Sequence, residues 1–235
     1  MSAGGKRTFD TRTVLVLAAV VALLSSGITY VLTRLSEPDL PGRGAPSVSP
    51  GRGPQPVAAF LGDSYTAGVG ASTPALQWTT LVARKEGWGE ANFGEAGSGY
   101  ITKGFDKTSY LGRVQEVVDV RPDIVVVAGG QNDMGSNGDV DAGVKATLEL
   151  LRDGLPTAKM FVVGPTWAEQ PPPPTLVEIE TAARKAAAEV DAQFIPALDW
   201  IAGRPDLMAP DNIHPNDAGH RLIADRVVAA VNGSR

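Results

Sequence analysis

The chain has 235 residues, 43% of them hydrophobic, and a formal net charge of -5. This length suits one globular domain with an additional segment, and the acidic balance argues against nucleic acid as a main partner. The absence of cysteine excludes disulfides, thiolate chemistry and Cys-ligated metal sites. Only two histidines, His214 and His220, are available for imidazole general-base chemistry.

The amino-terminal segment has the pattern of a membrane anchor. Residues 1–12 are polar and mainly basic, and the 19 residues from Val14 to Leu32 carry no charge. This run is close to the ~20 apolar residues that cross a bilayer. A cleaved signal peptide is the alternative, but its apolar region is usually shorter and its cleavage site clearer. We therefore expect a cytoplasmic tail over residues 1–12 and a transmembrane anchor, or an uncleaved signal, over residues 13–33.

A linker separates this segment from the rest of the chain. Six prolines and four glycines lie between Ser36 and Pro56, a composition that favours an extended tether over a packed core. We expect the tether to cover residues 34–56 and a single domain to cover residues 57–235. The domain would lie outside the membrane, or would be secreted if the signal were cleaved.

From Val57 onward, short apolar runs alternate with helical patterns. We predict strands over residues 57–61, 90–93, 123–128, 159–163 and 193–196, and helices over residues 75–86, 110–120, 140–151, 175–190 and about 216–231. The run 123–128 is continuous and β-branched, which is typical of a strand buried on both faces. Pro196 makes the last strand an edge strand. This alternation predicts a three-layer α/β/α domain with about five mainly parallel strands.

Residues suited to acyl transfer lie where ligands bind in such a sheet, at the carboxyl ends of the strands. Ser64 follows the first strand, Gly97 the second and Asn132 the third, whereas Asp211 and His214 precede the last helix. Acyl transfer needs a nucleophile, a base, an orienting carboxylate and donors for the oxyanion. Ser64, His214 and Asp211 could fill the first three roles in that order. The Gly97 N–H and the Asn132 amide are candidates for the donors.

A metal site is the competing interpretation of the carboxyl-terminal region. Its ligands would be Asp211, His214, Asp217 and His220. Pro215 and a helix that starts near residue 216 interrupt the helical spacing, so we disfavour a metal there. His220 is expected to be a surface or packing histidine.

Other residues near the motifs have open roles. Asp63 and Asp133 are expected to stabilise their own turns through local hydrogen bonds. Tyr65, Tyr100 and Trp167 could border a substrate pocket or pack in the core.

Four motifs resemble those of the SGNH hydrolases, also called GDSL esterases/lipases. They are Gly62-Asp63-Ser64, Asn92-x-Gly94-x-x-Gly97, Gly130-Gln131-Asn132-Asp133 and Asp211-x-x-His214-Pro215, in the family's order. The resemblance covers residues 57–231 and implies a flavodoxin-like sheet, a catalytic triad of Ser64, His214 and Asp211, and no cofactor. It also implies an oxyanion hole made by the N–H groups of Ser64 and Gly97 with the Asn132 amide. An α/β-hydrolase is disfavoured, because its G-x-S-x-G motif would need glycine at Thr66.

The sequence therefore predicts a membrane-tethered, extracytoplasmic serine esterase or lipase that works through an acyl-enzyme. The expected substrate is a small-molecule, glycan or lipid ester. One alternative is an acetylesterase or acetyltransferase that acts on cell-envelope glycans. A non-catalytic binding module is a weaker alternative, because such a module would be expected to have lost a catalytic residue.

Overall fold

The computed structural model of the chain describes residues 55–233. The predicted tail and anchor, and all but the end of the predicted tether, lie outside the described residues. Within residues 55–233, no helix combines the length and the apolar character that a bilayer crossing requires.

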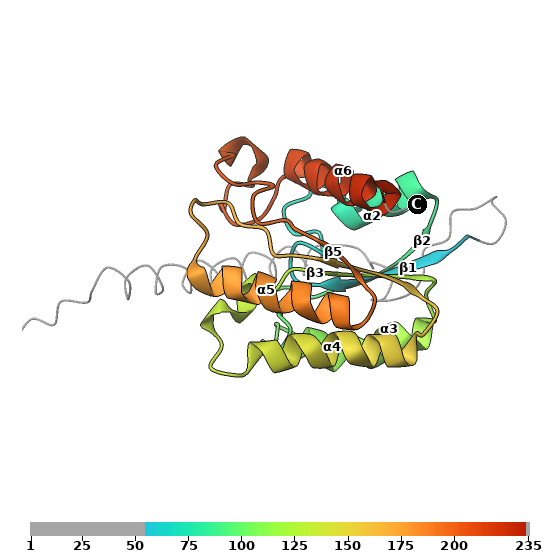
Figure 1. Cartoon of the computed structure of the whole chain (residues 1–235). Coiled ribbons are helices and arrows are strands. Elements are labelled where there is room, and N and C mark those ends of the chain that lie inside the picture. Colours follow the sequence, from blue (N-terminus) through green and yellow to red (C-terminus); the bar gives the residue numbers. More distant parts are fainter. Residues whose placement is uncertain (1–54, 234–235) are drawn as a thin grey trace, which may run out of the picture. The chain divides into compact units, whose positions relative to one another are not determined.

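A five-stranded parallel sheet forms the middle layer of the domain (Figure 1). Its strands are β1 (Val57–Gly62), β2 (Gly89–Gly94), β3 (Ile124–Ala128), β4 (Lys159–Val163) and β5 (Gln193–Ile195), in the order β2-β1-β3-β4-β5. All four neighbouring pairs are parallel. This is the flavodoxin-like strand order, and β5 lies at an edge as predicted.

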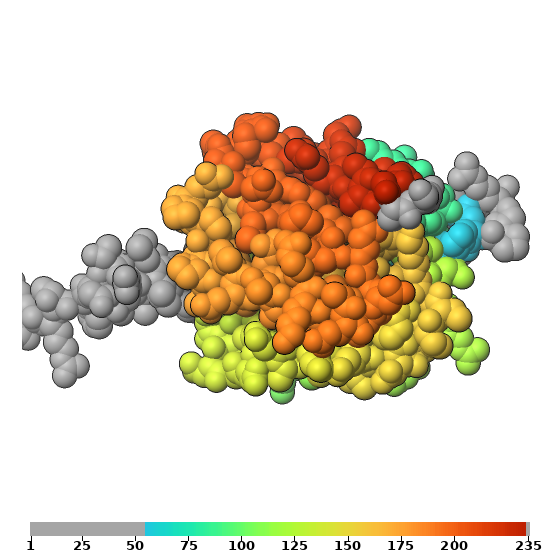
Figure 2. All heavy atoms as spheres, viewed as in Figure 1, coloured from blue at the N-terminus to red at the C-terminus, as the bar shows by residue number. Residues whose placement is uncertain are grey.

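Helices cover both faces of the sheet (Figure 1). The described residues form five α-helices: α2 (Trp78–Glu86), α3 (Tyr110–Val120), α4 (Val140–Gly154), α5 (Pro174–Glu189) and α6 (Asp217–Gly233). Helices α3, α4 and α5 pack on one face, and α2 and α6 pack on the other. In the space-filling view, atoms of the orange segment that includes β5 fill the space between α5 and α6 (Figure 2). The predicted three-layer α/β/α arrangement is confirmed.

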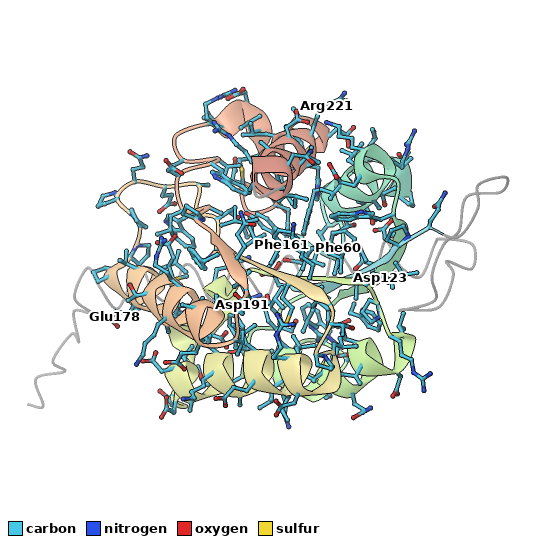
Figure 3. The ribbon with its side chains drawn as sticks, turned by 45° about the vertical axis from the view of Figure 1, so that its right-hand side comes forward. Phe60, Asp123, Phe161, Glu178, Asp191 and Arg221 are labelled. Carbon is cyan, nitrogen blue, oxygen red and sulfur yellow. The ribbon has the colours of Figure 1, made fainter. Side chains whose placement is uncertain are left out.

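Strand β3 explains why one stretch of sequence is continuously apolar. Val125 and Val127 belong to the core under α3, α4 and α5, whereas Val126 belongs to the core under α2 and α6. Phe60 and Phe161 lie in the second core, on the α6 side of the sheet (Figure 3). A strand with helices on both faces buries every side chain, so no polar residue alternates in it.

The predicted helix 75–86 is interrupted in the structure. A 3-10 helix covers Pro74–Leu76, Gln77 is extended, and α2 begins at Trp78. The buried residues of α2 are Trp78, Thr79, Val82 and Ala83. An unbroken helix over residues 75–86 would instead align Leu76 and Thr80 with Ala83. The break at Gln77 resets the helical phase, and the Trp78 ring packs edge-on against Phe60 with centroids 5.4 Å apart.

His220 is a buried packing residue that joins α6 to two other segments. Its Nδ1 accepts a hydrogen bond from the Trp78 N–H at 3.3 Å, and its Nε2–H donates to the Val69 carbonyl at 3.1 Å. Only the neutral ring, with one acceptor and one donor nitrogen, satisfies both partners. Burial lowers the pKa of His220 from 6.5 to about 4, although the Val69 carbonyl and nearby Asp217 act in the opposite direction.

Acid should weaken the fold through this histidine. The unfolded chain binds the His220 proton at a higher pH than the folded chain, so the contribution to stability is present above pH 6.5 and is lost as the pH falls toward 4. Between pH 7 and pH 5 we expect a loss of about 2 kcal/mol of unfolding free energy from His220. Urea unfolding of the wild type and of His220→Gln at both pH values measures this loss. The difference between their free energies of unfolding should change by this amount between pH 7 and pH 5. If that difference stays constant, His220 is not a neutral buried group.

Candidate active site

The strand register brings three candidate loops together at the carboxyl ends of the strands. Gly62, the last residue of β1, pairs with Gly94 of β2 on one side and with Ala128 of β3 on the other. The three strands therefore end at the same level. The chain reverses its direction of winding between β1 and β3, and ligands bind at such points in doubly wound sheets.

Ser64 lies on a tight turn directly after β1. The Ala67 N–H bonds to the Asp63 carbonyl, and the Val69 N–H bonds to the Ser64 carbonyl, both at 2.9 Å. A Cβ atom on Gly62 would lie 2.2 Å from Thr66 Oγ1, so the turn requires glycine there. The turn leaves Ser64 7% exposed at the end of the strand.

Asp63 supports the turn from inside the protein. Its carboxylate accepts hydrogen bonds from the Tyr65 N–H at 2.9 Å and from the Tyr110 hydroxyl at 3.1 Å. The predicted local hydrogen bond is confirmed, and a long-range bond is added to it. Complete burial raises the pKa of Asp63 to about 6, although both hydrogen bonds and nearby His214 lower it.

Gly97 and Asn132 are brought together through Ser98. The Asn132 Nδ2 donates to the Ser98 carbonyl at 2.8 Å, which leaves one N–H of the amide for another acceptor. Gly97 has a φ of 76°, in the left-handed region that favours glycine. Within residues 55–233, the N–H groups of Ser64 and Gly97 take part in no hydrogen bond. Each of the three predicted oxyanion donors therefore has an N–H group that is available to bind an oxyanion.

Asp133 holds the loop that follows Gly97. Its buried carboxylate accepts the N–H groups of Tyr100, Ile101 and Thr102 at 2.6, 3.2 and 2.9 Å, respectively. The prediction that this side chain bonds locally is wrong, because all three partners lie more than 30 residues away in the sequence. A carboxylate that accepts three N–H groups fixes the loop backbone in one conformation.

Asp211 and His214 form the predicted pair. Asp211 Oδ2 lies 2.7 Å from His214 Nδ1, and Asp211 Oδ1 accepts the N–H groups of Ile213 and His214 at 2.9 and 3.0 Å. Partial burial raises the pKa of Asp211, but the hydrogen bonds from His214 and Ile213 outweigh it and lower the pKa to about 2. With its Nδ1 proton directed at Asp211, the His214 ring has Nε2 free to accept a proton.

The Ser64 turn and the His214 loop contact each other. The Tyr65 hydroxyl donates to the Ile213 carbonyl at 2.5 Å, and the Tyr65 and His214 rings have centroids 5.9 Å apart. In the described part of the chain, no hydrogen bond joins the Ser64 hydroxyl to the His214 ring. Catalytic bonds of this kind often tighten only in the complex with substrate.

The other sequence interpretations have different outcomes. Tyr100 is a core residue whose ring packs on Tyr110 with centroids 4.9 Å apart, whereas Tyr65 does contact the site. The proposed metal ligands do not converge: Asp217 bonds to Ser72, and His220 bonds to α2 and to Val69. Nothing in the local sequence pattern pointed to the contact between Tyr65 and the Ile213 carbonyl, because its two partners are far apart in the chain.

Two of the cavities in residues 55–233 lie at opposite ends of the strands. One of about 530 Å³ lies at the amino-terminal ends of β4 and β5, near Asp191 (Figure 3). Its Arg152 guanidinium bonds to the carbonyls of Ala158 and Val190, which is a structural role. The other, of about 20 Å³, lies beside the nucleophile turn and is lined by Tyr65 and Thr66 among others. The larger cavity is far from the candidate chemistry, so its size does not make it the substrate site.

Residues 60–222 match the GDSL-like Lipase/Acylhydrolase family. The chain is 30% identical over 189 residues to the GDSL lipase Rv0518 of Mycobacterium tuberculosis. The aligned region covers 75% of this chain and 81% of that relative. The fold of this chain is similar to that of the salicylyl-acyltransferase SsfX3 from a tetracycline biosynthetic pathway, with a TM-score of 0.63 and 19% identity. The superposed region covers 77% of this chain and 55% of SsfX3. The fold is also similar to that of Est24, a carbohydrate acetylesterase from Sinorhizobium meliloti, with a TM-score of 0.61 and 18% identity. The superposed region covers 77% of this chain and 100% of Est24.

Removal of the Asp133 carboxylate should destabilise the protein strongly. Asp133→Ala leaves three N–H groups without their acceptor, and we expect a loss of about 3 kcal/mol or more in the free energy of unfolding. Asp139→Ala is the matched control, because Asp139 is exposed and, among residues 55–233, its side chain accepts a hydrogen bond only from the Ala142 N–H at the start of α4. This control should lose about 1 kcal/mol. Equal losses for the two variants in urea unfolding would contradict the role assigned to Asp133.

Proposed function

The chain belongs to the GDSL-like lipase/acylhydrolase family and is a serine hydrolase of esters, and from this premise we propose that Ser64, His214 and Asp211 form its catalytic triad. The observation that carries the proposal is the 2.7 Å contact between Asp211 and the His214 ring, in a loop that packs on the Ser64 turn. A carboxylate in this position holds the imidazole in the tautomer that can accept the serine proton.

The proposed reaction passes through an acyl-enzyme. His214 Nε2 takes the proton of Ser64 Oγ while Oγ attacks the carbonyl carbon of the ester. The carbonyl oxygen becomes an oxyanion, which accepts hydrogen bonds from the N–H groups of Ser64 and Gly97 and from the Asn132 amide. His214 then gives its proton to the leaving alcohol, and the acyl group remains on Ser64. Water repeats the cycle and releases the carboxylic acid.

We propose that the acyl group is short. A long acyl chain would need an extended apolar groove. Three large hydrophobic side chains of the described residues are exposed, Phe105, Leu150 and Val177, and they belong to three different segments. Acetyl esters of carbohydrates are a second candidate, which the fold similarity to the carbohydrate acetylesterase Est24 favours.

We further propose that the domain is tethered outside a membrane. The proposal rests on the uncharged run from Val14 to Leu32 and on the linker rich in proline and glycine that follows it. The basic residues before the run favour an amino terminus in the cytoplasm, which places residues 57–235 on the other side.

The nucleophile can be tested with a fluorophosphonate probe and with p-nitrophenyl acetate. Ser64→Ala should abolish labelling and lower kcat/KM by at least about 1000-fold. Asn132→Ala should still be labelled, but its kcat should fall by about 100- to 1000-fold because one oxyanion donor is missing.

Ser72→Ala is the control for these two variants. Ser72 is exposed, and its hydroxyl bonds to Asp217 rather than to any candidate site residue, so this variant should keep wild-type activity. Labelling that survives in Ser64→Ala would assign the nucleophile elsewhere. A folded wild-type protein that neither reacts with the probe nor hydrolyses the ester would refute the proposed function.

The tether predicts where the full-length chain is found. It should stay with the membrane fraction after an alkaline carbonate wash, and its intact mass should include residues 1–33. Protease added outside the membrane should digest residues 57–235. A shortened chain in the medium would indicate signal cleavage and would contradict the tether.

A further inference from the structure

Tyr65 connects three loops of the site through one side chain. Its hydroxyl donates to the Ile213 carbonyl at 2.5 Å and is hydrogen-bonded to the Thr166 hydroxyl in the loop after β4. Its ring packs on the His214 ring at a tilt of 56°. Its own backbone N–H bonds to Asp63, which fixes the start of the turn. Tyr65 is therefore part of the turn that carries Ser64, and it contacts the loop that carries His214.

The peptide group between Ile213 and His214 is held from both sides. Its carbonyl accepts the hydrogen bond from Tyr65, and its N–H donates to Asp211 Oδ1 at 3.0 Å. The other oxygen of the same carboxylate holds the His214 ring. A rotation of this peptide would break one of the two bonds, so Tyr65 and Asp211 together fix the backbone from which the imidazole projects.

We propose that Tyr65 is a positioning residue that holds His214 at its working distance from Ser64, an inference that rests on the proposed triad. The two side chains come from distant parts of the sequence, and within residues 55–233 they share no hydrogen bond. Their alignment therefore depends on contacts between the segments that carry them. A displacement of about 1 Å in such a pair can cost about 100-fold in rate.

The hydroxyl keeps its proton under the conditions in which it must donate. Burial raises the pKa of Tyr65 far above its ordinary value, and the nearby Asp63 carboxylate adds to the increase. The bond to the Ile213 carbonyl therefore does not titrate near neutral pH.

Tyr65→Phe removes only the hydroxyl and tests the proposal directly. We expect kcat on p-nitrophenyl acetate to fall about tenfold, with KM within about twofold of the wild type, because the contact aligns the reacting groups rather than binding substrate. The rate of fluorophosphonate labelling should fall in parallel. Tyr100→Phe is the matched control, because the buried Tyr100 hydroxyl has no hydrogen-bond partner in the described part of the chain. It should leave kcat unchanged.

A second measurement does not depend on activity. The Nδ1 proton of His214, bonded to Asp211, should exchange with water faster in Tyr65→Phe than in the wild type. The other histidine of the chain, His220, provides an internal reference, because its ring bonds to Trp78 and Val69. Its signal is assigned with His220→Gln.

The outcomes separate this inference from the proposed function. An inactive, unlabelled wild type refutes the triad, and the exchange rate of His214 still decides whether Tyr65 holds the loop. If Tyr65→Phe lowers the melting temperature but leaves kcat, labelling and proton exchange at wild-type values, Tyr65 has only a structural role and the proposal is wrong. A change in KM with kcat unchanged would also overturn it, because it would make Tyr65 a substrate-binding residue.

Discussion

The carbonyl of Gly62 is the point on which the geometry of the site depends. It accepts hydrogen bonds from the Glu95 N–H at 3.0 Å and from the Arg113 guanidinium at 2.9 Å. Arg113 is completely buried, and it also donates to Ser98 Oγ at 3.0 Å. A buried guanidinium is costly to the fold unless its hydrogen bonds are satisfied, so these acceptors confine it. In this way, the end of the nucleophile strand is attached to the loop that carries Gly97.

Two buried aspartates stabilise the site in different ways. Asp133 accepts three backbone N–H groups and thereby gives the loop after Gly97 a fixed shape. Asp63 accepts two hydrogen bonds, and complete burial raises its pKa to about 6. Both side chains accept hydrogen bonds from backbone close to the candidate oxyanion donors, Asp63 in the turn of Ser64 and Asp133 in the loop after Gly97. The oxyanion donors are therefore arranged by the fold before any substrate arrives, which is the condition under which such donors are effective.

The parts of the fold that the sequence predicted are those governed by short-range rules. The continuous apolar run of β3 shows its burial on both faces, and each of the four motifs is local, so the candidate site residues could be named in advance. The partners of Asp133 could not, because three N–H groups on a distant loop leave no periodicity in the sequence. The predicted start of the helix 75–86 was wrong because the start of α2 depends on one extended residue, Gln77, and on the packing of Trp78 against Phe60. The hydrogen bond from Tyr65 to Ile213 likewise depends on the tertiary fold.

The proposed catalytic residues come from segments that lead to opposite faces of the sheet. His214 precedes α6, which packs on one face of the sheet, whereas the loop after Gly97 leads to α3 on the other face. The β1 turn bonds to both segments, to one through Tyr65 and to the other through Gly62. The contact of Gly62 with Arg113 is buried and that of Tyr65 with Ile213 is partly buried, whereas Phe105, whose ring lies next to Gly97, is 42% exposed. A substitution at Phe105 would therefore change the exposed surface beside Gly97 without removing the contacts that align the proposed reacting groups.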